Sequence, residues 1–220
     1  MRTILMTSAL VAGLAAPVAA QEFEITLYSG VQSAPHSRAE GTYPGGGSFD
    51  ELVGWEGRSG AMPPYWGLRG TWWRSANSGV ALEFTHTKVY ADDTSKSDLG
   101  FSEFEFSDGH NILTVNYMHR WPEVMQRTTA FATVGAGIAV PHAEVTHPDS
   151  GSETFGYQYT GPALRLGAGV QRVGHGKIGP IRLAIQAQTI EIVQLCVATR
   201  GDHLGQHLAD HLKAQAAQGH

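Results

Sequence analysis

Apolar and polar residues alternate along five stretches of this chain, and a sixth, rich in Thr, Ala, Val and Gly, suits a strand although it alternates only weakly. Short connectors alternate with long ones between these stretches. Alternation with a period of two is typical of a half-buried β-strand, because successive side chains of a strand point to opposite faces. The expected strands cover residues 23–32, 66–72, 80–87, 113–117, 128–140 and 164–170. A soluble β-sandwich gives the same alternation, so the connectors have to separate the two architectures.

The connectors are short at residues 75–79 and 122–127, and long at about 35–64, 89–109 and 141–157. Outer-membrane β-barrels have short periplasmic turns and long external loops, which produces this order. Aromatic residues near the expected strand ends fit an interfacial girdle; they are Tyr65, Trp66, Trp72, Trp73 and Trp121. We therefore expect an all-β fold, a small antiparallel transmembrane β-barrel, with eight strands as in the narrow barrels of this class.

The first twenty residues have the composition of a secretory signal peptide. Arg2 precedes an apolar run that is densest at residues 9–16, and small residues follow at 17–20. This run is shorter than the ~20 residues that a spanning helix needs. We expect residues 1–20 to be cleaved on export and residues 21–195 to form a barrel in a bacterial outer membrane.

The overall composition excludes two further classes of protein. The net charge is −5, which argues against non-specific binding to nucleic acid. The only cysteine is Cys196, so a disulfide-stabilised fold is excluded as well. We expect a monomeric membrane protein without a nucleic-acid partner.

The last part of the chain changes in character. Every Phe, Trp and Tyr lies at or before Tyr159, and leucine and histidine each recur every fourth residue between 203 and 212. The second pattern predicts a helix rather than a closing strand. Two explanations stay open for an atypical, helix-like tail at residues 196–220. It is either a helical extension after an irregular barrel, or the product of a shifted reading frame beginning near residues 173–180. In both cases we expect the last barrel strands to be atypical or missing.

Two of the expected long loops contain residues suited to chemistry. Glu56 and Arg58 lie in the first loop, and Asp108 and His110 lie at the end of the second. Carboxylates with histidine and arginine are the residue types of acid–base catalysis and of metal sites. The alternative is structural: Glu56 and Arg58 pair with each other, and residues 107–109 (Ser-Asp-Gly) form a turn.

Three sequence stretches resemble the lipid A oxidase family: GWEGRS at 54–59, PPYWGLRGTWW at 63–73 and FSDGHNILTVNYMHRWP at 106–122. Members of this family are outer-membrane barrels that oxidise the proximal glucosamine of lipid A to 2-aminogluconate with dioxygen. The resemblance runs from about residue 23 to about residue 169. The chain departs from the family after about residue 173.

The resemblance implies a site at the outer rim, because the substrate lies in the outer leaflet. Arg58 and Arg69 would bind a lipid A phosphate. His110, with Asp108 nearby, would act as a base on the anomeric hydroxyl or as a metal ligand, and Glu56 as a second base or ligand. Dioxygen is the oxidant, and since its reactions are spin-restricted, a divalent redox metal is the candidate cofactor.

Two other functions stay open. A deacylase or palmitoyl transferase acting on the same lipid needs a serine beside a histidine, for which Ser107 and His110 are the local candidates. A non-enzymatic barrel, such as an adhesin or a structural porin-like protein, fits the Gly/Ser-rich stretch at residues 45–48.

The remaining charged residues have structural interpretations. His86 and His119 lie on expected strands and suit the girdle, whereas His142 and His147 join a site only if the third long loop folds towards it. Arg69, Arg165 and Glu83 are expected to point into the barrel, where buried charges have to pair; these two arginines and one glutamate would fill its lumen.

Overall fold

The computed structural model of the chain describes residues 22–43, 46–125, 128–149, 151–178, 181–187 and 193–196. This part is mostly antiparallel β-sheet with one short helix. The expected signal peptide and the tail from residue 197 lie outside the described residues, and Cys196, where that tail was expected to begin, ends a strand. Among the described residues, no helix has the length and apolar character needed to cross a membrane.

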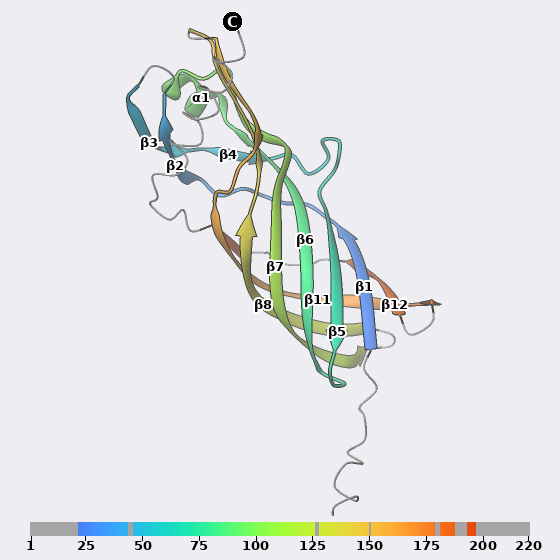
Figure 1. Cartoon of the computed structure of the whole chain (residues 1–220). Helices are drawn as coiled ribbons and strands as arrows, with labels where there is room; N and C mark the ends of the chain where they lie inside the picture. Colours follow the sequence, from blue (N-terminus) through green and yellow to red (C-terminus); the bar gives the residue numbers. More distant parts are fainter. Residues whose placement is uncertain are drawn as a thin grey trace, which may run out of the picture.

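The strands fall into three groups (Figure 1). The long strands are β1 (Glu22–Ser29), β5 (Trp66–Trp73), β6 (Ser78–Ala91), β7 (Glu103–Met125), β8 (Thr128–Ala139), β11 (Gly161–Ile178) and β12 (Ile181–Ala187). Short strands that extend the sheet are β4 (Trp55–Gly57), β9 (His142–His147), β10 (Ser152–Tyr157) and β13 (Val193–Cys196). A separate hairpin consists of β2 (Ser37–Thr42) and β3 (Ser48–Val53), next to the helix α1 (Asp93–Leu99).

The long strands form one sheet, which we call the long sheet, and they pair in a continuous path. Starting at β6, the neighbours are β7, β8, β11, β12, β1 and β5, and β5 pairs again with β6. All of these pairs are antiparallel except β12 with β1, which is parallel. A ring that contains an odd number of strands cannot be antiparallel throughout, and seven long strands belong to this one among the described residues. A further strand, β13, pairs with β11 beside it, and the expected number of eight barrel strands stays a prediction.

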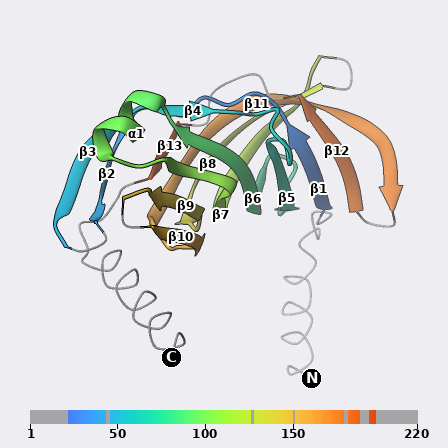
Figure 2. The same ribbon diagram turned by 90° about the horizontal axis from the view of Figure 1, so that it is seen from above.

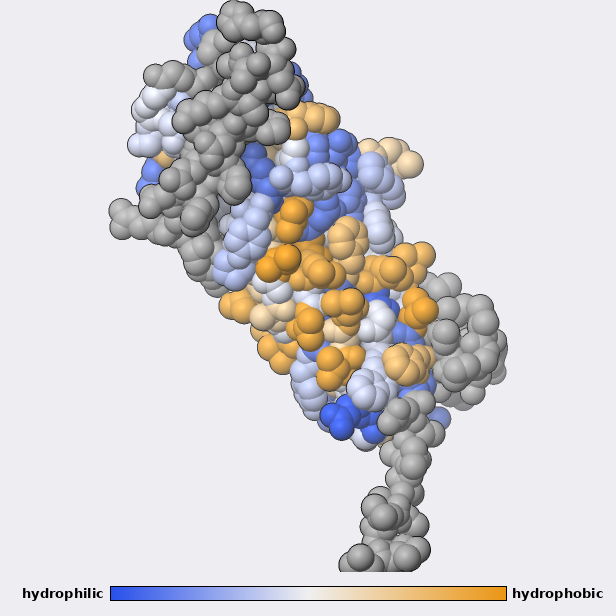
Figure 3. All heavy atoms as spheres, in the orientation of Figure 1, coloured by the Kyte–Doolittle hydropathy of each residue, from blue (hydrophilic) through white to orange (hydrophobic). Residues whose placement is uncertain are grey.

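Side chains of the long sheet are distributed in the opposite way to those of a water-soluble sheet. In β1, Phe23 and Leu27 are 51% and 59% exposed, whereas Glu24 and Thr26 are at most 1% exposed. The same alternation continues along β5, β7 and β11. Figure 3 shows the exposed apolar residues as an orange zone across the middle of the molecule, which we call the apolar belt.

The buried face of the long sheet carries paired charges. Arg165 Nη2 lies 2.8 Å from Glu83 Oε1, and the Tyr28 hydroxyl donates to the same carboxylate. Arg120 bridges Glu22 and Glu24 at 3.2 and 3.8 Å. The prediction that Glu83 and Arg165 pair in the interior is confirmed.

Beyond the apolar belt, β6 and β7 continue into a second region, which we call the outer sheet. It consists of β4, residues 88–91 of β6, residues 103–108 of β7, β9 and β10. One face of it is covered by the β2–β3 hairpin and α1 (Figure 2). The buried residues of this core are Val53, Ala91, Leu99, Phe101 and Phe104.

The outer sheet corrects the sequence prediction of three long loops. Residues 35–64, 89–109 and 141–157 contain β2, β3, β4, α1, β9 and β10, in addition to the ends of β6 and β7. The six predicted strands are all present, but β7 has 23 residues where about five were expected. Each added strand is short, and its alternation covers too few residues to stand out from a polar loop.

Candidate functional site

One row of neighbouring residues crosses all five strands of the outer sheet. The strand register places Glu56 opposite Tyr90, Tyr90 opposite Glu105, Glu105 opposite Glu144, and Glu144 opposite Phe155. Directly paired residues of neighbouring strands have their side chains on the same face. Three glutamates from β4, β7 and β9 therefore share one face of the outer sheet.

The sequences of β7 and β9 explain this polar face. In Glu-Phe-Glu-Phe, at residues 103–106, the phenylalanines belong to the apolar core and the glutamates lie opposite. In β9, Val145 packs against that core, whereas His142 and Glu144 lie on the other face, two residues apart. The face that the β2–β3 hairpin leaves uncovered is thus the acidic one.

A β-bulge in β7 directs Asp108 towards β9. His110 pairs with Thr87 of β6, and Phe106 pairs with Val89. Residues 107–109 of β7 therefore lie opposite a single residue of β6, Lys88. Gly109 ends the bulge with φ 118°, a conformation that favours glycine. The Ser-Asp-Gly stretch is therefore a bulge within a continuous strand and not the turn considered from the sequence.

Asp108, His142 and Glu144 meet beside this bulge. His142 Nδ1 lies 3.3 Å from Glu144 Oε1 and 3.8 Å from Asp108 Oδ2. One ligand atom from each residue lies within 4.8 Å of the others. An imidazole nitrogen with two carboxylate oxygens suits a divalent transition metal such as Mn²⁺, Fe²⁺ or Zn²⁺. We call these residues the rim triad.

Neighbouring side chains hold the rim triad in place. The Ser107 hydroxyl donates to Glu144 Oε1 at 2.6 Å, and the Asp108 backbone N–H donates to the same oxygen at 3.3 Å. The buried ring of His142 makes edge contacts with Phe155 and Tyr157, at centroid distances of 4.4 and 4.9 Å. Partners of this kind fix the orientation of metal ligands and tune their basicity.

Negative charge accumulates around the rim triad. Glu103, Glu105 and Glu144 form a second close group of carboxylates. The pKa of Glu105 is raised by burial and by the charges of Glu103 and Glu144, against the lowering effects of the Ser107 hydrogen bond and Arg58. Burial and the charge of Glu105 also raise the pKa of Tyr90. A bound cation would relieve this repulsion.

Glu56 and Arg58 share the acidic face but lie at its far edge. They form an exposed ion pair of 3.2 Å, and the Arg58 guanidinium stacks 4.2 Å above the Tyr90 ring. Three strand spacings separate Glu56 from Glu144, a distance of roughly 14 Å. The predicted pairing of Glu56 with Arg58 is confirmed, and Glu56 does not reach the rim triad.

His110 lies apart from the rim triad, although it follows Asp108 by only two residues. Its ring is 5.8 Å from that of Phe106, and burial lowers its pKa to about 4, so it is neutral at physiological pH. The structure brings His142, not His110, to Asp108. The pairing of His110 with Asp108, expected from their closeness in sequence, is therefore replaced by a contact between strands.

Arg69 lies inside the long sheet, between Thr26 and Glu83 in the strand register, and is fully buried. Its guanidinium lies 4.9 Å from the centre of the Phe131 ring. The expected contact of Arg69 with a lipid phosphate does not fit this position. The alternative expectation, that Arg69 points into the interior, is confirmed.

The other polar residues considered from the sequence have structural surroundings. The Ser107 hydroxyl is directed to Glu144 rather than to a histidine, so the described contacts do not form the serine–histidine pair of a deacylase. His86 stacks on Trp66 and contacts Asn111 at 2.9 Å, and the His119 ring lies 4.7 Å from Trp121. His86 is only 6% exposed whereas His119 is half-buried, and the girdle role expected for both stays a prediction.

His147 packs against Tyr43 and Phe101, away from the rim triad. Of the two loop histidines, only His142 joins the site. Glu103 and Glu105 belong to the stretch that suggested chemistry from the sequence but were given no role, and Glu144 was not considered at all. The alternation Glu-Phe-Glu-Phe and the spacing His142-x-Glu144 were the available signals, but they lay in segments interpreted as loops.

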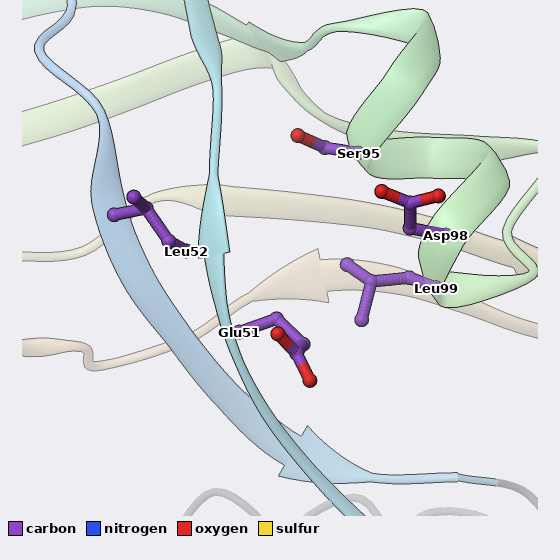
Figure 4. A pocket seen from close by; sticks show the side chains of 5 residues that line it. All are labelled: Glu51, Leu52, Ser95, Asp98 and Leu99. Carbon is purple, nitrogen blue, oxygen red and sulfur yellow. The ribbon is translucent and has the colours of Figure 1, made fainter.

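A shallow pocket between β3 and α1 lies elsewhere on the outer region (Figure 4). It is lined by Glu51, Leu52, Ser95, Asp98 and Leu99. The Ser95 hydroxyl accepts a hydrogen bond from the Gly54 N–H, and its own N–H donates to the helix cap Asp92. These contacts attach α1 to the strand connection, so the pocket is a packing feature.

No protein-family model, curated protein or solved structure matches this chain. The resemblance to the lipid A oxidase family stays a prediction from the three sequence stretches.

Proposed function

We propose that this chain is an outer-membrane β-barrel enzyme that oxidises the proximal glucosamine of lipid A to 2-aminogluconate with dioxygen. The observation that carries the proposal is the rim triad, a preorganised set of metal-binding side chains on the strands that continue past the apolar belt. The three sequence stretches that resemble the oxidase family supply the substrate and the reaction.

Two features support a barrel in a membrane. The pairings of the long strands lead from β6 back to β6, which supports the proposal of a closed barrel, the only β-architecture that spans a membrane. The outward side chains are apolar and the inward charges are paired. Burying a single exposed leucine or phenylalanine in lipid is worth about 1.5–3 kcal/mol, which makes the apolar belt favourable only in contact with hydrocarbon.

The height of the rim triad fits the headgroup of a lipid. Leu113 belongs to the apolar belt and pairs with Phe84 of β6, whereas the bulge that contains Asp108 lies opposite Lys88, four residues further along β6. At ~3.3 Å per residue and a strand tilt of about 40°, Asp108 lies roughly 10 Å above Leu113. The sugars of lipid A lie directly above its acyl chains, so they would face the outer sheet at this height.

The reaction removes two electrons and two protons from C1 and its hydroxyl group, giving a lactone. Dioxygen accepts both electrons and both protons and leaves as hydrogen peroxide, and water then opens the lactone to the 2-aminogluconate. A redox-active divalent metal, when bound to the rim triad, would supply the electron transfer that spin-restricted dioxygen requires.

The side chains of the outer sheet have distinct roles in this proposal. Asp108, His142 and Glu144 would hold the metal, and Ser107 orients Glu144 through its hydrogen bond. Glu105 accepts the proton of the anomeric hydroxyl, since its raised pKa brings it closer to neutral pH. Arg58, at the far edge of the same face, is the candidate ligand for a phosphate of the substrate.

The test is mass spectrometry of lipid A from cells that carry or lack the gene, with His142→Ala and Glu144→Gln as variants. We expect a shift of about +16 Da with the wild-type gene but not with the His142→Ala or Glu144→Gln variant, because the reaction adds one oxygen atom. Asp149→Asn is the matched control, an exposed carboxylate in the turn of the same hairpin, and should behave as wild type.

Other outcomes identify the competing functions. Loss or gain of an acyl chain would indicate a deacylase or a palmitoyl transferase. Unchanged lipid A in cells that insert the protein into the membrane would contradict an enzymatic role and leave a non-enzymatic barrel. An unimpaired shift with both rim-triad variants would place the chemistry elsewhere.

A further inference from the structure

Two aromatic side chains project from the acidic face of the outer sheet. Phe155 and Tyr157 lie two residues apart on β10 and are 62% and 67% exposed. The register pairs Phe155 with Glu144 and Tyr157 with His142, so both share the face of the rim triad. Their rings also contact the His142 ring directly.

Neither ring is needed for the core of the outer region. That core lies on the opposite face, where β9 contributes Val145. The apolar belt does not account for Phe155 either. Ala139 pairs with Ile112, next to Leu113 of the belt, and so marks the level of the belt. Glu144, the strand partner of Phe155, follows Ala139 by five residues, which is about 16 Å of extended chain. Exposed aromatic rings above the belt and beside a polar cluster indicate a binding surface.

We propose that Phe155 and Tyr157 form a stacking platform for a pyranose ring of the lipid A headgroup and so position that sugar on the rim triad. This inference rests on the proposed function and specifies how its substrate is held. The axial C–H groups of a pyranose make an apolar face that packs on an aromatic ring, while its hydroxyl groups stay available for hydrogen bonds.

The charges around the platform favour a sugar over an acyl chain. Asp108 and Glu144 lie beside His142, and Glu105 adjoins Glu144 in the next strand. An acyl chain over these rings would desolvate the carboxylates without offering them hydrogen-bond donors, which is costly. A sugar instead donates its hydroxyl protons to carboxylate oxygens, and such charge-assisted hydrogen bonds are the stronger kind.

The platform can be tested without the reaction. The probe is the acyl-free glucosamine disaccharide monophosphate of lipid A, which has a free anomeric hydroxyl on the proximal sugar, titrated calorimetrically into refolded protein in detergent micelles. The variants are Phe155→Leu, Tyr157→Leu and the double variant, in which leucine keeps apolar bulk against His142. We expect Kd to rise about 2- to 10-fold for each ring and further for the double variant, because an aromatic contact contributes that much.

Three controls make the titration specific. Tyr117→Leu removes a similarly exposed tyrosine from the apolar belt and should leave Kd unchanged. Tyr157→Phe keeps the ring and should retain wild-type binding. Folding of every variant is checked by the mobility difference between heated and unheated samples on denaturing gels.

The outcomes separate this inference from the proposed function. If the disaccharide binds wild type and the double variant equally, or binds neither, the platform is wrong. If it binds through the two rings but lipid A is never oxidised, the platform stands and the oxidase proposal fails. If lipid A is oxidised with the same KM by wild type and double variant, the oxidase stands without the platform; a raised KM at nearly constant kcat supports both.

A core oligosaccharide of lipopolysaccharide has the same stacking chemistry, so it serves as a second probe. Binding of the lipid A disaccharide in preference to that oligosaccharide is expected. The reverse preference would overturn the assignment of the platform to lipid A.

Discussion

Gly109 is the residue on which the geometry of the rim triad most directly depends. With φ 118° it occupies a region that costs other residues about 1–3 kcal/mol. A Cβ there would lie 2.3 Å from His86 Cε1 and 2.8 Å from Asn111 Oδ1. Relieving this overlap moves His86, which costs another ~1–3 kcal/mol and weakens its 2.9 Å contact with Asn111.

We therefore expect Gly109→Ala to lower the free energy of unfolding by about 2–6 kcal/mol, measured by urea titration in detergent micelles. The strain would also shift Asp108 relative to His142 and lower the affinity for Mn²⁺ about 10- to 100-fold, the usual effect of disturbing the support of a metal ligand. Gly156→Ala in β10 is the control, because a Cβ there meets no atom within 4 Å.

A second variant separates the overlap with His86 from the backbone strain at residue 109. In Gly109→Ala/His86→Ala the overlap with the imidazole disappears, whereas the backbone strain stays. This double variant should recover part of the metal affinity lost in Gly109→Ala. If Gly109→Ala unfolds within 0.5 kcal/mol of wild type and binds Mn²⁺ equally well, then the bulge does not hold Asp108 in place and the reasoning is wrong.

Three further predictions concern the metal, the interior and pH. Equilibrium dialysis should show Mn²⁺ or Fe²⁺ bound to wild type and to Asp149→Asn but lost in His142→Ala and Glu144→Gln; equal binding by all four would contradict the rim triad. Glu83→Ala leaves Arg165 buried without its 2.8 Å partner and should cost about 3–5 kcal/mol of unfolding free energy, whereas a joint Glu83→Leu/Arg165→Met replacement should cost less. Burial lowers the pKa of His110 to about 4, so the folded state resists protonation; the stability that this neutral histidine contributes is complete above about pH 6.5 and is lost as the pH falls towards 4, by at most about 3 kcal/mol. The difference between the urea midpoints at pH 7 and at pH 4.5 should therefore be smaller for His110→Gln than for wild type. An equal difference would refute the assignment of this pH-dependent stability to His110.

The strands of the long sheet were predictable because their pattern is local. In β1 the apolar residues Phe23, Ile25 and Leu27 alternate with polar ones, and the exposed fractions follow that alternation. The pairing of Glu83 with Arg165 followed from the same logic, since charges directed inward have to be compensated.

The rim triad was not predictable in the same way. Asp108 and His142 are brought together by a strand pairing and a bulge, and neither has a strong local signal in the sequence. Closeness along the chain instead suggested His110 as the partner of Asp108. The bulge separates them, because it turns Asp108 towards β9 while His110 stays paired opposite Thr87.

The distribution of charge on the outer sheet also bears on how a substrate would lie. The carboxylates gather at the β7–β9 side of the acidic face, whereas Arg58 lies at the β4 edge, roughly 14 Å away. An anionic disaccharide would be repelled from the first side and attracted to the second, so its phosphate would lie near Arg58 and its phosphate-free end near the rim triad. Oxidation at C1 requires a free anomeric hydroxyl at that same end. The electrostatics of the face and the chemistry of the proposed reaction thus demand the same orientation, and Arg58→Glu should raise KM for phosphorylated lipid A more than for lipid A without phosphate.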